Sequence, residues 1–140
     1  MRRALLLAGV VGFLAVALGA FGAHGLKPFL ESRHADDPAR AAHLLEVWHT
    51  ACHYALAHAL ALLAVAALTP HLGGRALSAA SWLFLAGTAV FSGTLWALVL
   101  SDMSALGAIT PLGGLLLLGG WIACALSARS PAAPQPGAKP

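Results

Sequence analysis

Four long apolar runs constrain this chain more than any other feature. They cover residues 4–23, 47–68, 76–100 and 105–126 and contain few ionisable side chains. A helix rises about 1.5 Å per residue, so a run of about 20 residues spans the roughly 30 Å hydrocarbon core of a bilayer. Only 9% of the 140 residues are charged, against about 25% in an average soluble domain. We therefore expect an all-α membrane protein, with four transmembrane helices in an antiparallel bundle.

The connection before the second run carries helix-start signals. Residues 24–37 are polar, and Asp36 or Asp37 can cap a helix that has Pro38 at its first position. Residues 38–46 are amphipathic. We expect them to lie in or above the lipid headgroups, as an amphipathic extension before the second transmembrane helix.

The other connections are short, and all four runs belong to one domain, residues 1–126. Pro70 predicts the end of the second helix. The turn at residues 101–104 makes the third and fourth helices antiparallel neighbours, and we expect its Asp102 to be a solvated turn residue. The tail, residues 127–140, is rich in Pro and Ala and predicts disorder.

The first run also has features of a secretory signal peptide. It follows Arg2 and Arg3, and small residues at Ala20 and Gly22 fit a cleavage site after Gly22. The run is long for a signal peptide, however, and three further apolar runs follow it. We therefore expect the first helix to be retained in the membrane.

Small residues recur at helical spacing within the runs. Ala89, Gly93 and Ala97, for example, form a stripe with four-residue spacing, and such stripes let helices approach closely in lipid. The Thr110-Pro111 step predicts a bend in the fourth helix, with freed carbonyls that need partners in the bundle. The glycines that we expect to serve packing are Gly12, Gly19, Gly93, Gly113 and Gly114.

Lysine and arginine residues near the runs predict the orientation. Five of the eight lie at the N-terminus, in the connection after the second run and in the tail, and three lie on the opposite side. We expect a multi-pass protein of the bacterial inner membrane with both termini in the cytoplasm. The five are Arg2, Arg3, Arg75, Arg129 and Lys139, and the three are Lys27, Arg33 and Arg40.

His58 is the ionisable side chain that we expect near the bilayer midplane. Counting from Val47, it lies roughly 16 Å below the outer boundary. At this depth an imidazole predicts a proton relay or a substrate pocket. The alternative is a packing role, in which a neutral imidazole hydrogen-bonds Thr88 or a carbonyl freed by Pro111. We favour packing, because no second readily ionised group lies at that depth. The intramembrane polar candidates are His58, Tyr54, Thr88 and Thr110.

Glu46, His49 and His53 are candidate metal ligands. At about 100° per residue they fall within about 60° of one another on a helix. A Glu-x-x-His pair with a further histidine can present three ligands to zinc, copper or iron. The alternative is that all three are ordinary interfacial residues, which we favour. The groups best placed to complete a site are His24, His34 and Asp102.

Several function classes are disfavoured. The net charge of +3 comes from scattered residues, without the basic face or aromatic platform that binds nucleic acid. The two cysteines, Cys52 and Cys124, lie at ends of runs expected on opposite sides of the membrane. The sequence shows no nucleophile–base pair, phosphate-binding glycine loop or paired intramembrane carboxylates. We therefore expect no enzyme, no cofactor and no nucleic-acid partner.

Five blocks of sequence together resemble a known family. The resemblance is to the small bacterial inner-membrane family catalogued as domain of unknown function 423, related to eukaryotic transmembrane protein 256. It implies four membrane helices and retention of the first, but no activity. This chain departs from the family pattern at Ala57, where an aromatic residue often precedes His58, and in its longer first connection. The blocks are Gly19–Leu26, Tyr54 with His58–Leu63, Phe91–Leu95, Leu106–Gly114 and Gly120-Trp121.

The sequence leaves three functions open. The first is a structural or assembly partner in the lipid bilayer that associates with other membrane proteins or with itself, which the small-residue stripes favour. The second is a small transporter or proton-linked carrier that uses His58. The third is a metal-binding membrane protein that uses Glu46, His49 and His53.

Overall fold

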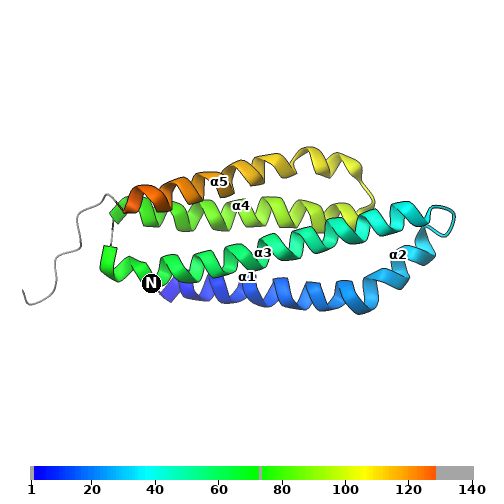
Figure 1. Ribbon diagram of the computed structural model, residues 1–140, viewed down its shortest axis with the longest axis horizontal. Coiled ribbons are helices and arrows are strands. Elements are labelled where there is room, and N and C mark those ends of the chain that lie inside the picture. Colours follow the sequence, from blue (N-terminus) through cyan, green and yellow to red (C-terminus); the bar gives the residue numbers. More distant parts are fainter. Residues whose placement is uncertain (1, 73, 129–140) are drawn as a thin grey trace, which may run out of the picture.

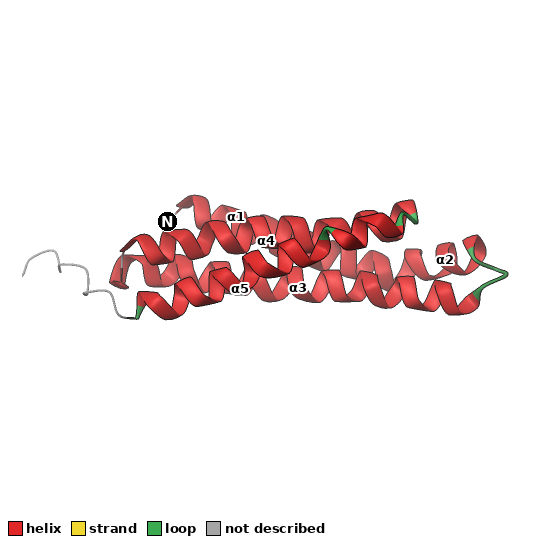
Figure 2. Ribbon diagram, turned by 90° about the horizontal axis from the view of Figure 1, so that it is seen from above, coloured by secondary structure: helices red, strands yellow, loops and turns green. Residues whose placement is uncertain are grey.

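The computed structural model describes residues 2–72 and 74–128, and every regular element in these ranges is helical. Four helical segments are long and apolar enough to cross a membrane. They run antiparallel to one another along the long axis of the molecule (Figures 1 and 2). The protein is therefore an all-α membrane protein, as predicted. The segments are Ala4–Arg33, Pro38–Leu72, Gly74–Ser101 and Ser104–Ser127.

The first segment is longer than the sequence predicted. Helix α1 (Arg2–Phe21) continues through a π-helix, η1 (Gly22–Leu26), into helix α2 (Lys27–Arg33). Residues 24–33 are thus helical, and the expectation of a polar connection there is wrong. The reason is tertiary packing. Leu26 and Leu30 lie one turn apart, pack against the start of the next helix, and are only 0% and 1% exposed.

Helix α3 (Pro38–Leu72) has 35 residues and is therefore about 52 Å long. Its start is as predicted, because the Asp37 carboxylate accepts a hydrogen bond from the Arg40 backbone N–H at 3.0 Å. Its end is not, because the helix continues through Pro70 to Leu72. A proline removes only the hydrogen bond from its own backbone nitrogen to the carbonyl four residues earlier, and the last turn of α3 tolerates this loss.

Helix α4 (Gly74–Ser101) is followed by a short 3₁₀ helix, η2 (Ser104–Ala108), and by helix α5 (Thr110–Ser127). Pro111 therefore lies in the first turn of α5 and does not bend a continuous helix, which corrects the expected kink. The first turn has backbone N–H groups without helical partners, so a residue that lacks this group costs nothing there. Residues 129–140, most of the predicted disordered tail, lie outside the described residues.

The helices pack in chain order. Helix α1 packs mainly on α3, α3 on α4, and α4 on α5, so α1 and α5 lie at the two edges (Figure 1). Glycines allow the closest approaches: a Cβ at Gly87 would lie 2.6 Å from Leu117 of α5, and one at Gly120 would lie 2.6 Å from Phe84 of α4. Large apolar side chains cover the outside, as a lipid-facing surface requires; Phe13 is 72% exposed and Trp82 is 66% exposed.

The two ends of the bundle differ. The start of α1, the end of α3, the start of α4 and the end of α5 lie at one end (Figure 1). At the other end, the turn between α2 and α3 projects beyond the α4–α5 connection (Figure 1). The first turns of α3, with α2 packed against them, therefore lie beyond α4 and α5, which agrees with the extension predicted for residues 38–46.

Candidate functional site

His58 lies on α3 where that helix meets α4 and α5, and it is 6% exposed. Its ring centroid lies 5.5 Å from that of Phe84 and 6.2 Å from that of Trp121. Tyr54, one turn earlier, stacks on Phe91 with centroids 4.4 Å apart. His58, the residue that we expected near the bilayer midplane, is thus surrounded by aromatic rings from three helices.

The hydrogen bond of His58 fixes its tautomer. Nδ1 lies 2.8 Å from the backbone carbonyl oxygen of Tyr54, and a carbonyl oxygen accepts but cannot donate. Nδ1 therefore carries a proton, and in a neutral imidazole Nε2 is an acceptor. Nε2 is buried and has no hydrogen-bond partner among the described residues.

The hydrogen bond expected between His58 and Thr88 is not formed. Thr88 is 4% exposed, and its hydroxyl also has no partner within the described part of the chain. The two side chains line different hollows: His58 lines one between α3, α4 and α5, and Thr88 lines one between α1 and α4. Thr110, the remaining polar candidate, is buried, and its hydroxyl lies 2.9 Å from that of Thr94 on α4.

The hollow beside His58 is a groove of about 530 Å³. Its surface is mainly apolar, and its wall at α5 includes Gly114, where the missing side chain leaves room. The groove lies on the outside of the bundle, so in a membrane it opens to lipid. Its lining residues from the three helices are Tyr54, His58, Phe91, Pro111, Gly114, Leu115, Leu117, Leu118 and Trp121.

The predicted metal ligands are not brought together. Glu46, His49 and His53 are all exposed on α3, and His53 Nδ1 lies 3.1 Å from the carbonyl oxygen of His49. Within residues 2–72 and 74–128, no three histidine, cysteine or acidic side chains form a group that could hold a metal ion. Among the described residues, no neighbouring helix supplies a ligand to this face, and His34 and Asp102 lie next to each other in a different cluster.

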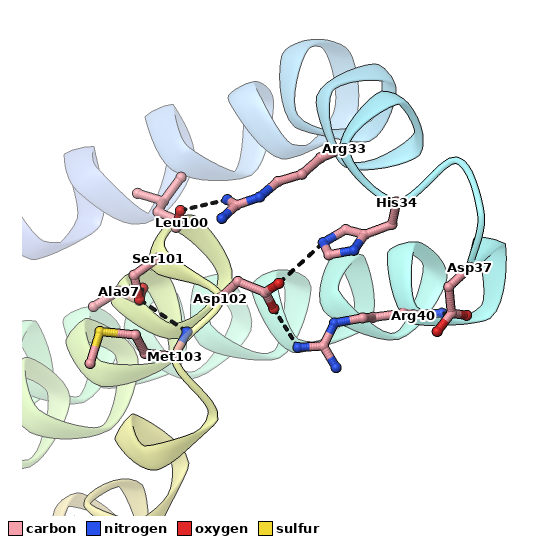
Figure 3. Close-up of polar contacts among 9 residues, drawn as sticks. All are labelled: Arg33, His34, Asp37, Arg40, Ala97, Leu100, Ser101, Asp102 and Met103. Carbon is pink, nitrogen blue, oxygen red and sulfur yellow. Dashed lines mark hydrogen bonds and ion pairs between the residues drawn. The ribbon is translucent and has the colours of Figure 1, made fainter.

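A polar cluster at the projecting end was missed by the sequence reasoning. Asp102, in the α4–α5 connection, forms an ion pair with Arg40 at the start of α3, and its second oxygen lies 3.6 Å from His34 Nε2 (Figure 3). Arg33 at the end of α2 donates to the Leu100 carbonyl oxygen at 2.9 Å. Asp102 is therefore not the solvated turn residue that we expected.

The cluster ties three segments of the chain together at one point. The Asp102 side chain is 23% exposed, and its hydrogen bond with the Arg40 guanidinium holds the pKa of the carboxyl below its ordinary value. Asp102 has a backbone φ of 60°, in the left-handed region that Asp adopts more readily than most residues. The available signal was that Arg40 and Asp102 were expected on the same side of the membrane, but sequence could not place them within bonding distance.

The packing candidates behave differently from one another. A Cβ at Gly113 would collide with the backbone of Phe91, because it would lie 2.8 Å from the Phe91 Cα. A Cβ at Gly12 would make an ordinary contact with Ala59 at 3.6 Å. A Cβ at Gly114 would lie 3.9 Å from Phe91. A Cβ at Gly19 or Gly93 would meet nothing within 4 Å. The chain's own packing therefore explains some of these glycines but not Gly19 or Gly93.

Comparison with known proteins identifies the family. Residues 18–114 match the family described as "Protein of unknown function (DUF423)". The chain belongs to the DUF423 family. The UPF0382 membrane protein YwdK of Bacillus subtilis (strain 168) is 40% identical over 129 residues, which cover 91% of this chain and 97% of that protein. A UPF0382 membrane protein of Schizosaccharomyces pombe is 40% identical over 119 residues, 81% of this chain and 91% of that protein.

A third relative, a UPF0382 membrane protein of Staphylococcus aureus (strain bovine RF122 / ET3-1), is 38% identical over 124 residues, with 87% of this chain and 91% of that protein covered. No solved structure matches the chain. The predicted resemblance to DUF423 is thus confirmed. This DUF423 protein is an integral membrane protein of a family whose biochemical function is unknown.

Proposed function

We propose that this protein is a non-catalytic assembly partner in the membrane. It packs the outer face of α4 against a transmembrane helix of another membrane protein or of a second copy of itself. The observation that carries this proposal is Gly93, a half-exposed glycine on α4: a Cβ there would meet nothing within 4 Å, so contacts among the described residues do not require a glycine.

Gly93 belongs to an outward-facing stripe of small residues on α4. Ala89 and Ala97, one turn before and after it, are both exposed. Elsewhere on α4 a glycine is needed inside the bundle: at Gly87 a Cβ would collide with Leu117. In lipid, small residues at four-residue spacing let a second helix backbone approach closely. The α4 outer stripe (Ala89, Gly93 and Ala97) therefore supports a helix-binding role.

A polar group beside the stripe supports the same role. Thr88 lines a hollow of about 130 Å³ between α1 and α4, together with Ala89 and Gly93. Other helix hydroxyls bond to the carbonyl four residues earlier, as Thr69 and Ser81 do at 2.7 and 3.2 Å. The Thr88 hydroxyl makes no such bond. Hydrogen bonds between membrane helices stabilise their association by about 0.6 kcal/mol on average.

A proton-linked carrier is less well supported. Among the described residues, the buried polar side chains are His58 and four hydroxyls: Thr88, Ser92, Thr110 and Ser127. A proton delivered to His58 would thus meet no carboxylate, amine or second imidazole at its depth. The exposed, ungrouped Glu46, His49 and His53 likewise give a metal-binding function no support.

We place the protein in the bacterial inner membrane with both termini in the cytoplasm. The excess of lysine and arginine on the side of the termini supports this orientation. Figure 1 shows the start of α1 and the end of α5 at the same end of the bundle, which supports placing both termini on one side of the membrane.

The assembly role is tested by enlarging one small residue. Gly93→Leu adds bulk to the stripe from a position where nothing lies within 4 Å of a Cβ. Gly9→Leu is the matched control: Gly9 is equally open on α1 but is flanked one turn away by Leu5 and Phe13. Both variants are purified with the wild type in mild detergent, and co-purifying proteins and oligomeric mass are measured.

We expect the wild type to carry a stoichiometric partner or to dimerise. Gly93→Leu should weaken that association by about tenfold, equivalent to ~1.4 kcal/mol, and Gly9→Leu should leave it unchanged. A monomeric wild type without a partner, or equal effects of the two variants, would contradict the proposal.

A further inference from the structure

The groove beside His58 has the size and lining of a small-molecule site. Its volume of about 530 Å³ lies within the range of about 300–1,000 Å³ that is typical of ligand pockets. Three aromatic side chains line it: Tyr54, Phe91 and Trp121. Leu115 and Leu118, 64% and 61% exposed, form its edge toward the lipid.

One polar side chain in the lining lacks a partner. His58 is 6% exposed, its Nδ1–H donates to the Tyr54 carbonyl at 2.8 Å, and its Nε2 has no partner among the described residues. A charged imidazole at the level of the hydrocarbon is disfavoured, so Nε2 is an acceptor. A ligand that satisfies it must supply a hydrogen-bond donor.

The aromatic lining favours a flat ring. Tyr54 and Phe91 stack with an interplanar angle of 26° and a centroid distance of 4.4 Å, and aromatic ligands pack well on such ring faces and edges. Nε2 itself exposes less than 1 Å², so a neighbouring side chain must turn aside to admit a ligand. Trp121 is 53% exposed and can turn toward the lipid while leaving the core intact.

We propose that this groove binds a membrane-soluble phenol, the chemical class that includes quinols. The phenol hydroxyl donates to His58 Nε2, the ring packs between the Tyr54–Phe91 pair and Trp121, and an apolar tail leaves past Leu118 into the lipid. This site is separate from the assembly role, because the α4 outer stripe and its hollow border α1, whereas the groove borders α5.

The experiment compares 4-octylphenol with its methyl ether, which has the same ring and tail but no donor. Binding to the full chain in phosphatidylcholine nanodiscs is measured by calorimetry for three proteins: wild type, His58→Phe and Trp82→Leu. His58→Phe removes the acceptor and keeps a ring. Trp82→Leu is the matched control, because Trp82 is an exposed aromatic on α4 that does not line the groove.

We expect the phenol to bind wild type about tenfold more tightly than the ether, as one added hydrogen bond allows. His58→Phe should abolish this difference, and Trp82→Leu should retain it. In wild type labelled with ¹⁵N-histidine, the phenol and not the ether should shift the Nε2 resonance of His58, a readout that needs no variant. Equal binding of both compounds, or an unmoved Nε2 resonance at saturating phenol, would overturn the proposal. Either result would indicate that lipid acyl chains fill the groove instead.

Discussion

Single polar side chains in this protein find partners on the backbone more often than on one another. His58 donates to the Tyr54 carbonyl, and Ser92, which is fully buried, donates to the Ala51 carbonyl of α3 at 2.9 Å. The side-chain pair His58–Thr88 was one of two bonds expected from sequence, but the two side chains line different hollows. Asp102 is different, because its carboxylate accepts a hydrogen bond from the Arg40 side chain and lies 3.6 Å from His34 Nε2.

The Asp102 cluster predicts a dependence of stability on pH. Because the Arg40 hydrogen bond lowers the pKa of Asp102 in the folded protein, the carboxylate contributes stability above its unfolded pKa, about 3.9. This contribution is lost as the pH falls through the folded pKa. Asp102→Asn removes the charge but keeps a residue type that tolerates a φ of 60°. It should lower the Tm in detergent at pH 7, and the difference should shrink as the pH falls below 3.9.

The control for this prediction is Asp36→Asn. Asp36 is an exposed carboxylate in the turn between α2 and α3, and its neutralisation should leave the Tm close to that of the wild type at every pH. A Tm difference for Asp102→Asn that persists unchanged at the lowest pH would assign the effect to something other than the ion pair.

At the scale of elements, close helix contacts are set by single glycines. Gly113→Ala places a Cβ only 2.8 Å from the Cα of Phe91. This distance is too short for a normal contact, so α5 must move away from α4. Gly114→Ala is its matched neighbour, with Phe91 Cδ2 at 3.9 Å. Both changes bring the same gain in helix propensity, about 1 kcal/mol. We expect Gly113→Ala to be less stable than Gly114→Ala by ~1–3 kcal/mol in reversible unfolding in detergent. Equal stability would show that the α4–α5 contact yields easily.

The helices were predictable because apolar runs of this length have few alternatives, whereas their ends depended on neighbours. Leu26 and Leu30 continue the first helix only because α3 extends far enough to bury them. From sequence alone, Pro111 is equally compatible with a bend in a long helix and with the first turn of a new one. The structure has a 3₁₀ helix before it, so Pro111 lies in the first turn of α5. His58 was found from depth alone, but the groove beside it required knowing which faces of α3, α4 and α5 meet.

At the scale of the whole molecule, the proposed orientation is open to direct labelling. In a background that lacks Cys52 and Cys124, Ala35→Cys places a thiol in the projecting turn and His71→Cys places one at the other end of α3; both native side chains are exposed. An impermeant maleimide should label Ala35→Cys in intact cells and His71→Cys only after lysis. The opposite pattern would place the termini outside.

The packing of the helices in chain order has a consequence for biogenesis. Each helix after the first has an extensive contact with the segment that precedes it in synthesis: α3 with the first segment, α4 with α3 and α5 with α4. A newly inserted helix therefore finds one packing neighbour already in the bilayer. Contacts that are local in sequence form rapidly. The exception is the Asp102 cluster, which joins the α4–α5 connection to the ends of α2 and α3 that meet at the first turn. Its ion pair can form only after α4 has been inserted.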